Sequence, residues 1–239
     1  MIIKKYVVNS NKSINMTIAI ISDIHGRFNN KITENLKQNK PDIIAITGDL
    51  VDEKKPMNSE LLSILSKLTV IAPTYMSLGN HDYVLNDFDI KAIRKIGIRV
   101  LDNDWICCGK NIILGGFTSA FVLKCRKYGI ESNEIVCSDL EWLQQFSELE
   151  GYKILLDHHP ENYLLYTKKM DIDLILSGHT HGGQVAIFGY GLYIPKQKLW
   201  PRYSGGKYEN RLVVSRGVSN TRIIPRLGNP TELVYLKIN

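Results

Sequence analysis

The sequence of 239 residues lacks the features that define several large classes of protein. It has no run of about 18 apolar residues and therefore predicts no membrane-spanning helix. Lysine and asparagine interrupt the segment from Met1 to Met16, so we expect no secretory signal there. Repeats, low-complexity tracts and linkers are also missing. We therefore expect a single domain over residues 1–239.

Cysteine is scarce, with four residues at Cys107, Cys108, Cys125 and Cys137. None of them forms a C-x-x-C pair, which disfavours a structural thiolate zinc site. We interpret them as reduced thiols, which suits a cytoplasmic protein. Peripheral association with a membrane stays open.

Positive charge is only mildly in excess, with 30 Lys and Arg against 24 Asp and Glu, a net charge of +6. This balance favours anionic partners. No helix-turn-helix, zinc-finger pattern or basic run of five residues is present, so we expect no obligatory nucleic-acid partner. Oligomeric state does not follow from the composition.

Apolar runs of strand length alternate with helix-like segments. The predicted strands are 18–22, 43–47, 74–78, 153–156 and 174–177, and the predicted helices are 29–40, 58–68, 87–96 and 138–149. Ser138 and Glu141 form a capping-box pattern, and Gly97 marks a helix end. Three further strands, 184–194, 211–215 and 233–238, follow without helices. The alternation predicts an α/β layered domain.

Polar side chains follow each of the five buried strands. These residues are Asp23, His25, Asp49, Asn80, His81, Asp82, Asp157, His158, His159, His179 and His181. All six histidines of the chain are among them. Because sites in α/β sheets form at the carboxyl ends of strands, we expect these side chains to converge. Gly48, Gly79 and Gly178 are expected to permit tight turns there.

The residue types indicate a metal centre. Histidine nitrogen with carboxylate and amide oxygen suits Mn, Fe or Zn and suits Ca poorly. Seven residues are candidate ligands, more than one ion needs: Asp23, His25, Asp49, Asn80, His158, His179 and His181. Such a set fits two divalent ions about 3.5–4 Å apart, an arrangement used in phosphoryl transfer.

The series D-x-H, G-D, G-N-H-D, H and G-H-x-H, over residues 23–181, resembles the calcineurin-like metallophosphoesterases. The last third of the chain resembles their YkuE-like bacterial branch, through the segments 182–195, 203–208 and 215–230. The resemblance implies a four-layer α-β-β-α sandwich of two mixed sheets flanked by helices.

The resemblance also implies residue roles. Asp23, His25 and His181 would hold the first metal, while Asn80, His158 and His179 would hold the second. Asp49 would bridge the two metals, and a bridging hydroxide would attack phosphorus in line. His81 would stabilise the transition state or protonate the leaving oxygen, oriented by Asp82.

Two neighbouring histidines, His158 and His159, leave a choice for one ligand position. In the related bacterial sequences the ligand directly follows the strand, two residues before a proline, which favours His158. Consecutive strand residues point in opposite directions, so both can hardly bind one metal. His159 would face a neighbouring loop or the substrate.

The implied function is hydrolysis of a phosphate monoester or diester, or of a pyrophosphate or lipid-linked phosphate, with two divalent metals. Manganese is the leading expectation, and Fe and Zn are the alternatives. The expected partner is a small phosphorylated substrate. The alternative functions are a catalytically silent metal-binding scaffold and a nuclease-type phosphodiesterase.

Overall fold

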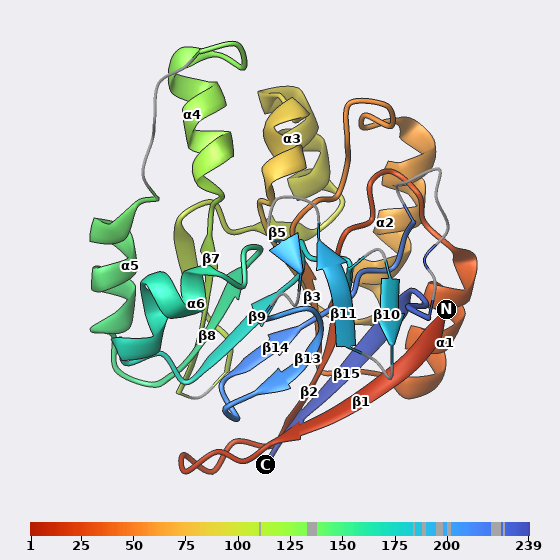
Figure 1. Cartoon of the computed structure of the whole chain (residues 1–239). Coiled ribbons are helices and arrows are strands. Elements are labelled where there is room, and N and C mark those ends of the chain that lie inside the picture. Colours follow the sequence, from red (N-terminus) through yellow and green to blue (C-terminus); the bar gives the residue numbers. More distant parts are fainter. Residues whose placement is uncertain are drawn as a thin grey trace.

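In the computed structural model, two six-stranded sheets pack face to face and helices cover their outer faces (Figure 1). The structure describes residues 1–109, 111–132, 138–183, 185–187, 190–194, 198–199, 202–220, 226 and 228–239.

The first sheet joins both ends of the chain to its first half. Its order is β1 (Ile2–Val8), β15 (Glu232–Ile238), β2 (Met16–Ile21), β3 (Ile43–Thr47), β4 (Thr74–Ser77) and β5 (Ile98–Val100). Neighbouring strands are parallel except β15 and β2, which are antiparallel. The sheet is therefore mixed, and β2, β3 and β4 bring their carboxyl ends to one edge.

The second sheet is mixed as well. Its order is β13 (Gly206–Tyr208), β14 (Leu212–Val214), β9 (Leu174–Ser177), β8 (Tyr152–Asp157), β7 (Ile112–Phe117) and β6 (Asp104–Cys107). The central four strands are parallel and the two edge strands antiparallel. A small third sheet contains β10 (Val185–Ile187), β11 (Tyr190–Ile194) and β12 (Lys198–Leu199).

The alternation of side chains along the strands separates the core into layers. In β2, Ile18 and Ile20 belong to the cluster between the sheets, whereas Ala19 and Ile21 face the helices. Complete burial of each isoleucine contributes roughly 1.5–3 kcal/mol.

On the outer face of the first sheet lie α1 (Asn30–Asn39), α2 (Ser59–Ile71) and α3 (Asp87–Lys95). On the outer face of the second lie α5 (Leu140–Ser147) and α6 (Asn162–Leu165). The remaining short elements are α4 (Ala120–Tyr128), η1 (Asn80–Val84) and η2 (Thr167–Lys169). The predicted four-layer α-β-β-α sandwich is confirmed.

Most predicted elements are present within two or three residues of their expected bounds. The start of α5 differs from the prediction. Asp139, not Ser138, caps this helix, and its side chain accepts a hydrogen bond from the Trp142 N–H. Gly97, with φ of 95°, follows α3 as expected. The predicted strand over 184–194 contains β10 and β11, and residues 184 and 188–189 lie outside the described part.

Among the described elements, six strands and two α-helices were not predicted from the sequence, namely β1, β5, β6, β7, β12, β13, α4 and α6. Within the described ranges, no helix is both long enough and apolar enough to span a bilayer. Cys107, Cys108 and Cys125 are free thiols, and Cys137 lies outside the described residues.

Candidate metal centre

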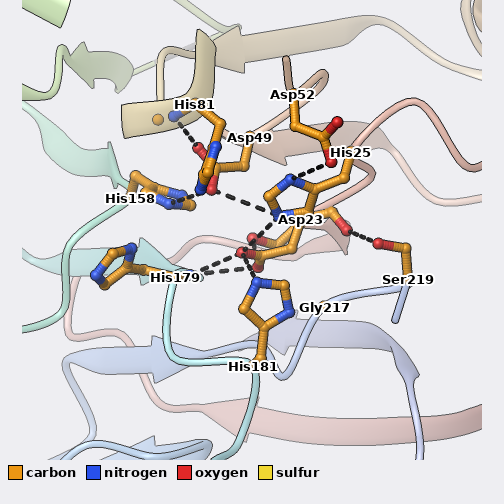
Figure 2. Close-up of polar contacts among 12 residues, drawn as sticks. Asp23, His25, Asp49, Asp52, His81, His158, His179, His181, Gly217 and Ser219 are labelled. Carbon is orange, nitrogen blue, oxygen red and sulfur yellow. Dashed lines mark hydrogen bonds and ion pairs between the residues drawn. The ribbon is translucent and has the colours of Figure 1, made fainter. Parts of the chain in front are cut away.

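The carboxyl ends of five strands, drawn from both large sheets, meet at one edge of the sandwich. Asp23 and His25 follow β2, and Asp49 follows β3. Asn80 begins η1 directly after β4. From the second sheet, His158 follows β8, and His179 and His181 follow β9. Figure 2 shows His158 and His179 on one side of Asp49, and His25 and His181 on the other.

Asp23, His25 and His181 form the first group of candidate ligands, with ligand atoms within 4.8 Å of one another. The His181 Nε2 atom lies 3.3 Å from the Asp23 Oδ1 atom, and the His25 Nε2 atom lies 3.9 Å from it. Donor atoms that bind one ion at about 2.0–2.2 Å are separated by similar distances. The three residues predicted for the first metal subsite therefore lie together.

Asp49, His158 and His179 form the second group. The His158 Nε2 atom lies 3.1 Å from the Asp49 Oδ2 atom, and the His25 Nε2 atom of the first group lies 3.6 Å from that same oxygen. Asp49 therefore stands between the two groups, where a carboxylate shared by two ions would lie.

Unpartnered buried atoms show that a divalent metal fits this place. The His25 Nε2, His158 Nε2 and Asn80 Oδ1 atoms are buried and have no hydrogen-bond partner among the residues that the structure describes. An unsatisfied buried polar group costs about 1–3 kcal/mol, and each of these atoms is a good metal donor. Coordination would satisfy all three at once.

The electrostatics favour the ligating forms of most of these groups. Burial raises the pKa of Asp49, but His158 and His25 outweigh it and bring the pKa well below the usual carboxyl value. Burial lowers the pKa of His179 to about 3 and of His181 to about 4. At neutral pH the carboxylate is charged and these imidazoles are neutral, as metal binding requires.

His158 differs, because Asp49 outweighs the effect of burial and raises the His158 pKa to about 10. A divalent ion would take the place of the proton on this ring. The Nδ1 atom of His158 is 2.8 Å from the Thr47 carbonyl oxygen, which accepts its hydrogen and leaves Nε2 for a metal.

His181 has a different outer partner. The Arg226 guanidinium donates to its Nδ1 atom at 2.8 Å and also donates to the carbonyls of Arg216 and Ser219. A neutral imidazole has one lone pair, so coordination through Nε2 requires Arg226 to release this contact.

Backbone strain is concentrated at the predicted ligands. Five non-glycine residues of the site have left-handed φ values: Asp23 (55°), His25 (47°), Asp49 (54°), His179 (69°) and His181 (51°). This conformation costs roughly 1–2 kcal/mol for an ordinary residue and is found at functional sites. The fold thus holds these side chains at an energetic cost, as expected for a site maintained for chemistry.

Asp82 does not orient His81 as predicted. Its buried carboxylate accepts four backbone N–H groups, from Asp49, Leu50, Val51 and Gly79. The side chain therefore shapes the loop that presents Asp49. His81 instead donates its backbone N–H to the Asp49 Oδ1 atom at 2.8 Å, and its ring lies 5.0 Å from that of His25.

The two neighbouring histidines point to different surroundings. His158 is fully buried between the sheets and faces Asp49. The His159 Nε2 atom lies 2.9 Å from the Ser119 hydroxyl, at the start of α4. His159 therefore faces a neighbouring loop, one of the two expectations for it.

Sequence reasoning missed several groups that hold Asp23. The Ser22 hydroxyl donates to the Asp23 carboxylate at 2.5 Å. The Ser219 hydroxyl donates to the Asp23 carbonyl at 2.7 Å (Figure 2). A Cβ atom on Gly217 would lie 2.7 Å from that of Asp23. The available signal was the Ser-Arg-Gly-Val segment that follows β14, another strand end at the same edge.

Gly178 is needed for space rather than for its backbone conformation. A Cβ atom there would lie 1.7 Å from the Ser22 Oγ atom and 2.6 Å from the Asp23 Oδ2 atom. We expect Gly178→Ala to lower the free energy of unfolding by roughly 1–3 kcal/mol, measured by urea denaturation. Adding Ser22→Ala should recover part of this loss, and an unchanged stability of Gly178→Ala would contradict the close approach.

Asp157, at the end of β8, predicts a pH dependence of stability. Its buried carboxylate accepts hydrogen bonds from the His159 N–H and the Asn162 amide, and burial raises its pKa to about 7. Because the folded-state pKa exceeds the unfolded value of 3.8, the stability that this group contributes is present at low pH. It is lost as the pH rises through about 7.

Asp157→Asn keeps the acceptor oxygen and removes the ionisation. In metal-free protein at pH 8 this variant should be more stable than the wild type, by up to roughly 4 kcal/mol, and the difference should vanish near pH 4. Denaturant unfolding at both pH values measures this. An equal difference at the two pH values would rule out ionisation of Asp157 as the cause.

Comparison with known proteins bears on this geometry. The family model described as calcineurin-like phosphoesterase matches residues 16–183. The chain is 29% identical over 234 residues to an uncharacterized metallophosphoesterase of Helicobacter pylori J99, covering 93% of the chain and 60% of that relative. It is also 29% identical over 234 residues to the uncharacterized metallophosphoesterase YkoQ of Bacillus subtilis, covering 93% of the chain and 83% of that relative.

The chain thus spans less than two thirds of the length of the Helicobacter relative. Among solved structures, the sulfate thiohydrolase SoxB of Thermus thermophilus is similar with a TM-score of 0.53 at 12% identity. That match covers 69% of this chain and 48% of SoxB, and it supports the fold alone. The family match includes every candidate ligand described above, and the chain belongs to the calcineurin-like phosphoesterase family.

Proposed function

We propose that the chain is a phosphoesterase that uses two divalent metal ions to hydrolyse a phosphate monoester or diester. The observation that carries the proposal is the position of Asp49, whose Oδ2 atom lies 3.1 Å from the His158 Nε2 atom and 3.6 Å from the His25 Nε2 atom. One carboxylate thereby serves two groups of ligands. We propose manganese as the metal pair, with iron or zinc as alternatives that the same donors accept.

When bound, two divalent ions would supply an acidified water and neutralise charge on the phosphoryl oxygens. The chain provides the rest of the chemistry. Asp23, His25 and His181 would hold the first ion, and Asn80, His158 and His179 the second. Asp82 keeps the Asp49 loop in place through its four backbone hydrogen bonds.

His81 is the proposed proton donor to the leaving oxygen. It follows Asn80 in η1, its backbone is anchored to Asp49, and its side chain is half-buried near His25. A histidine at this position can reach a phosphate ester bound across the two ligand groups and need not be a ligand itself.

The proposed substrate is a small phosphorylated molecule, and lipid-linked phosphate and pyrophosphate remain within the same chemistry. A cytoplasmic location is part of the proposal, supported by the three free thiols among the described residues.

The test is a substrate panel with purified, manganese-loaded protein. It contains 4-nitrophenyl phosphate, bis(4-nitrophenyl) phosphate, a nucleotide sugar and single-stranded DNA. We expect manganese-dependent hydrolysis of at least one of these compounds. Metal-loaded protein without activity above an Asp49→Ala control would leave a metal-binding scaffold as the function.

A further inference from the structure

Glu161 directly precedes α6, and its carboxylate lies beside His179, one of the predicted metal ligands. Its Oε1 atom is 3.9 Å from the His179 Nε2 atom and 3.5 Å from the His159 Nδ1 atom. His159 is held in turn by the Ser119 hydroxyl, 2.9 Å from its Nε2 atom. The carboxylate thus lies close to both imidazole rings, whose centroids are 4.4 Å apart.

The same arrangement occurs at the first subsite. The His25 Nε2 atom faces Asp23 and Asp49, while its Nδ1 atom lies 3.6 Å from the Asp52 Oδ2 atom (Figure 2). Each group of ligands therefore includes one histidine with a carboxylate beside its ring. The two distances are longer than a hydrogen bond, but a carboxylate beside the outer N–H of a histidine favours the tautomer and orientation that leave the inner nitrogen for a metal.

We propose that Glu161 is a positioning residue for His179 and acts selectively on the second metal, with Asp52 as its counterpart for His25 and the first metal. The inference rests on the proposed two-metal function. At 3.9 Å from the His179 Nε2 atom the Glu161 carboxylate is not hydrogen-bonded to it, but its negative charge favours the Nε2–H tautomer and leaves Nδ1 with the lone pair that binds the ion.

A third ion held by His159, Glu161 and His179 is the competing interpretation, since their donor atoms also lie within 4.8 Å of one another. It would require both ring nitrogens of His179 to bind metal. A neutral imidazole has only one free lone pair, so one ring cannot serve two ions without losing its last proton. The positioning role needs no such deprotonation.

The experiment measures manganese binding by titration and by elemental analysis after desalting. The proteins are wild type, Glu161→Gln, Asp52→Asn and the control Glu141→Gln, which alters an exposed glutamate of α5. Wild type and control should bind two ions per chain. Glu161→Gln should weaken one of them about 10–100-fold and leave the other unchanged. Electron paramagnetic resonance should then show isolated manganese in place of a coupled pair.

Asn80→Ala, which removes a ligand of the second subsite, assigns the ion that is lost. In this background Glu161→Gln should have no further effect on the remaining ion, whereas Asp52→Asn should weaken it. The melting temperature of metal-free Glu161→Gln should equal that of the wild type, because the side chain is 40% exposed.

Three results would overturn the inference. Two ions bound to Glu161→Gln with wild-type affinity would show that Glu161 has no positioning role. Loss of a third wild-type equivalent, with two retained, would favour the third cation site. Equal weakening of both ions together with lower metal-free stability would indicate general loosening. A wild type that binds no metal would instead refute the proposed function.

Discussion

Replacing Asp49 with alanine is expected to weaken the binding of both metals by more than about 100-fold, beyond the usual effect of removing an outer-shell partner. The Asp49 carboxylate lies close to both His25 and His158. Without it, each group loses an anionic donor, and the repulsion between two neighbouring divalent ions is no longer offset. Phosphoesterase activity should fall by at least about 10³-fold.

Isothermal titration with manganese and hydrolysis of bis(4-nitrophenyl) phosphate measure the two effects. Asp49→Asn is the matched variant, since it keeps the shape and the acceptor for the His81 N–H while removing the charge. Both variants should fold, because metal-free protein buries this carboxylate against histidines rather than in the hydrophobic core. Two ions bound to Asp49→Ala with wild-type affinity would show that Asp49 does not bridge.

Replacing His81 with alanine should lower turnover without weakening metal binding. Both metals should remain bound with wild-type affinity, while turnover falls by about 10²–10⁴-fold, the usual contribution of a proton-transferring group. A ligand atom of His81 lies within 4.8 Å of those of His25 and Asp49, so the distances alone would allow His81 to bind a metal. Metal binding by His81→Ala therefore distinguishes a ligand from a proton donor.

Metal stoichiometry separates the two roles. If His81→Ala binds only one ion, His81 is a ligand and the proton-transfer role is wrong. A substrate with a better leaving group, such as a 2,4-dinitrophenyl ester, should lose less activity in His81→Ala than a poor one. Equal losses on both substrates would also count against leaving-group protonation.

The metal centre could be predicted from the sequence because its information is local. Each candidate ligand lies within four residues of the end of a short buried strand, so the apolar run and the polar residues after it are close together in the chain. The convergence of five such ends follows from the α/β architecture. The choice of His158 over His159 came from the resemblance to related bacterial sequences, whereas the alternation of side chains indicated only that the two residues face different surroundings.

The elements that were not predicted depend on distant partners. β1 pairs along its whole length with β15, at the other end of the chain, and exposes Ile3, Lys5 and Val7 to solvent. β7 contains Gly115 and Gly116, which indicate a turn in isolation. In the structure the Phe146 ring packs against Gly115 and the Leu101 backbone packs against Gly116. A Cβ atom would lie 2.5 Å from the Phe146 ring at the first position and 2.4 Å from the Leu101 backbone at the second.

The residues that position the ligands could not be predicted from the sequence either. Asp82 was expected to act on His81 because the two are adjacent, yet its carboxylate turns back to amides of the Asp49 loop. Asp52, Glu161 and Ser219 act across strand ends that only the packed sheets bring together. Such contacts depend on tertiary distances, which a single sequence does not contain.

The proposed hydrolysis requires two ions bound around Asp49. The most direct test is to measure bis(4-nitrophenyl) phosphate hydrolysis as a function of manganese bound per chain, starting from metal-free protein. The two-metal account predicts little activity up to one bound ion and a rise that ends at two. Full activity at one ion, or none with two ions bound, would contradict it.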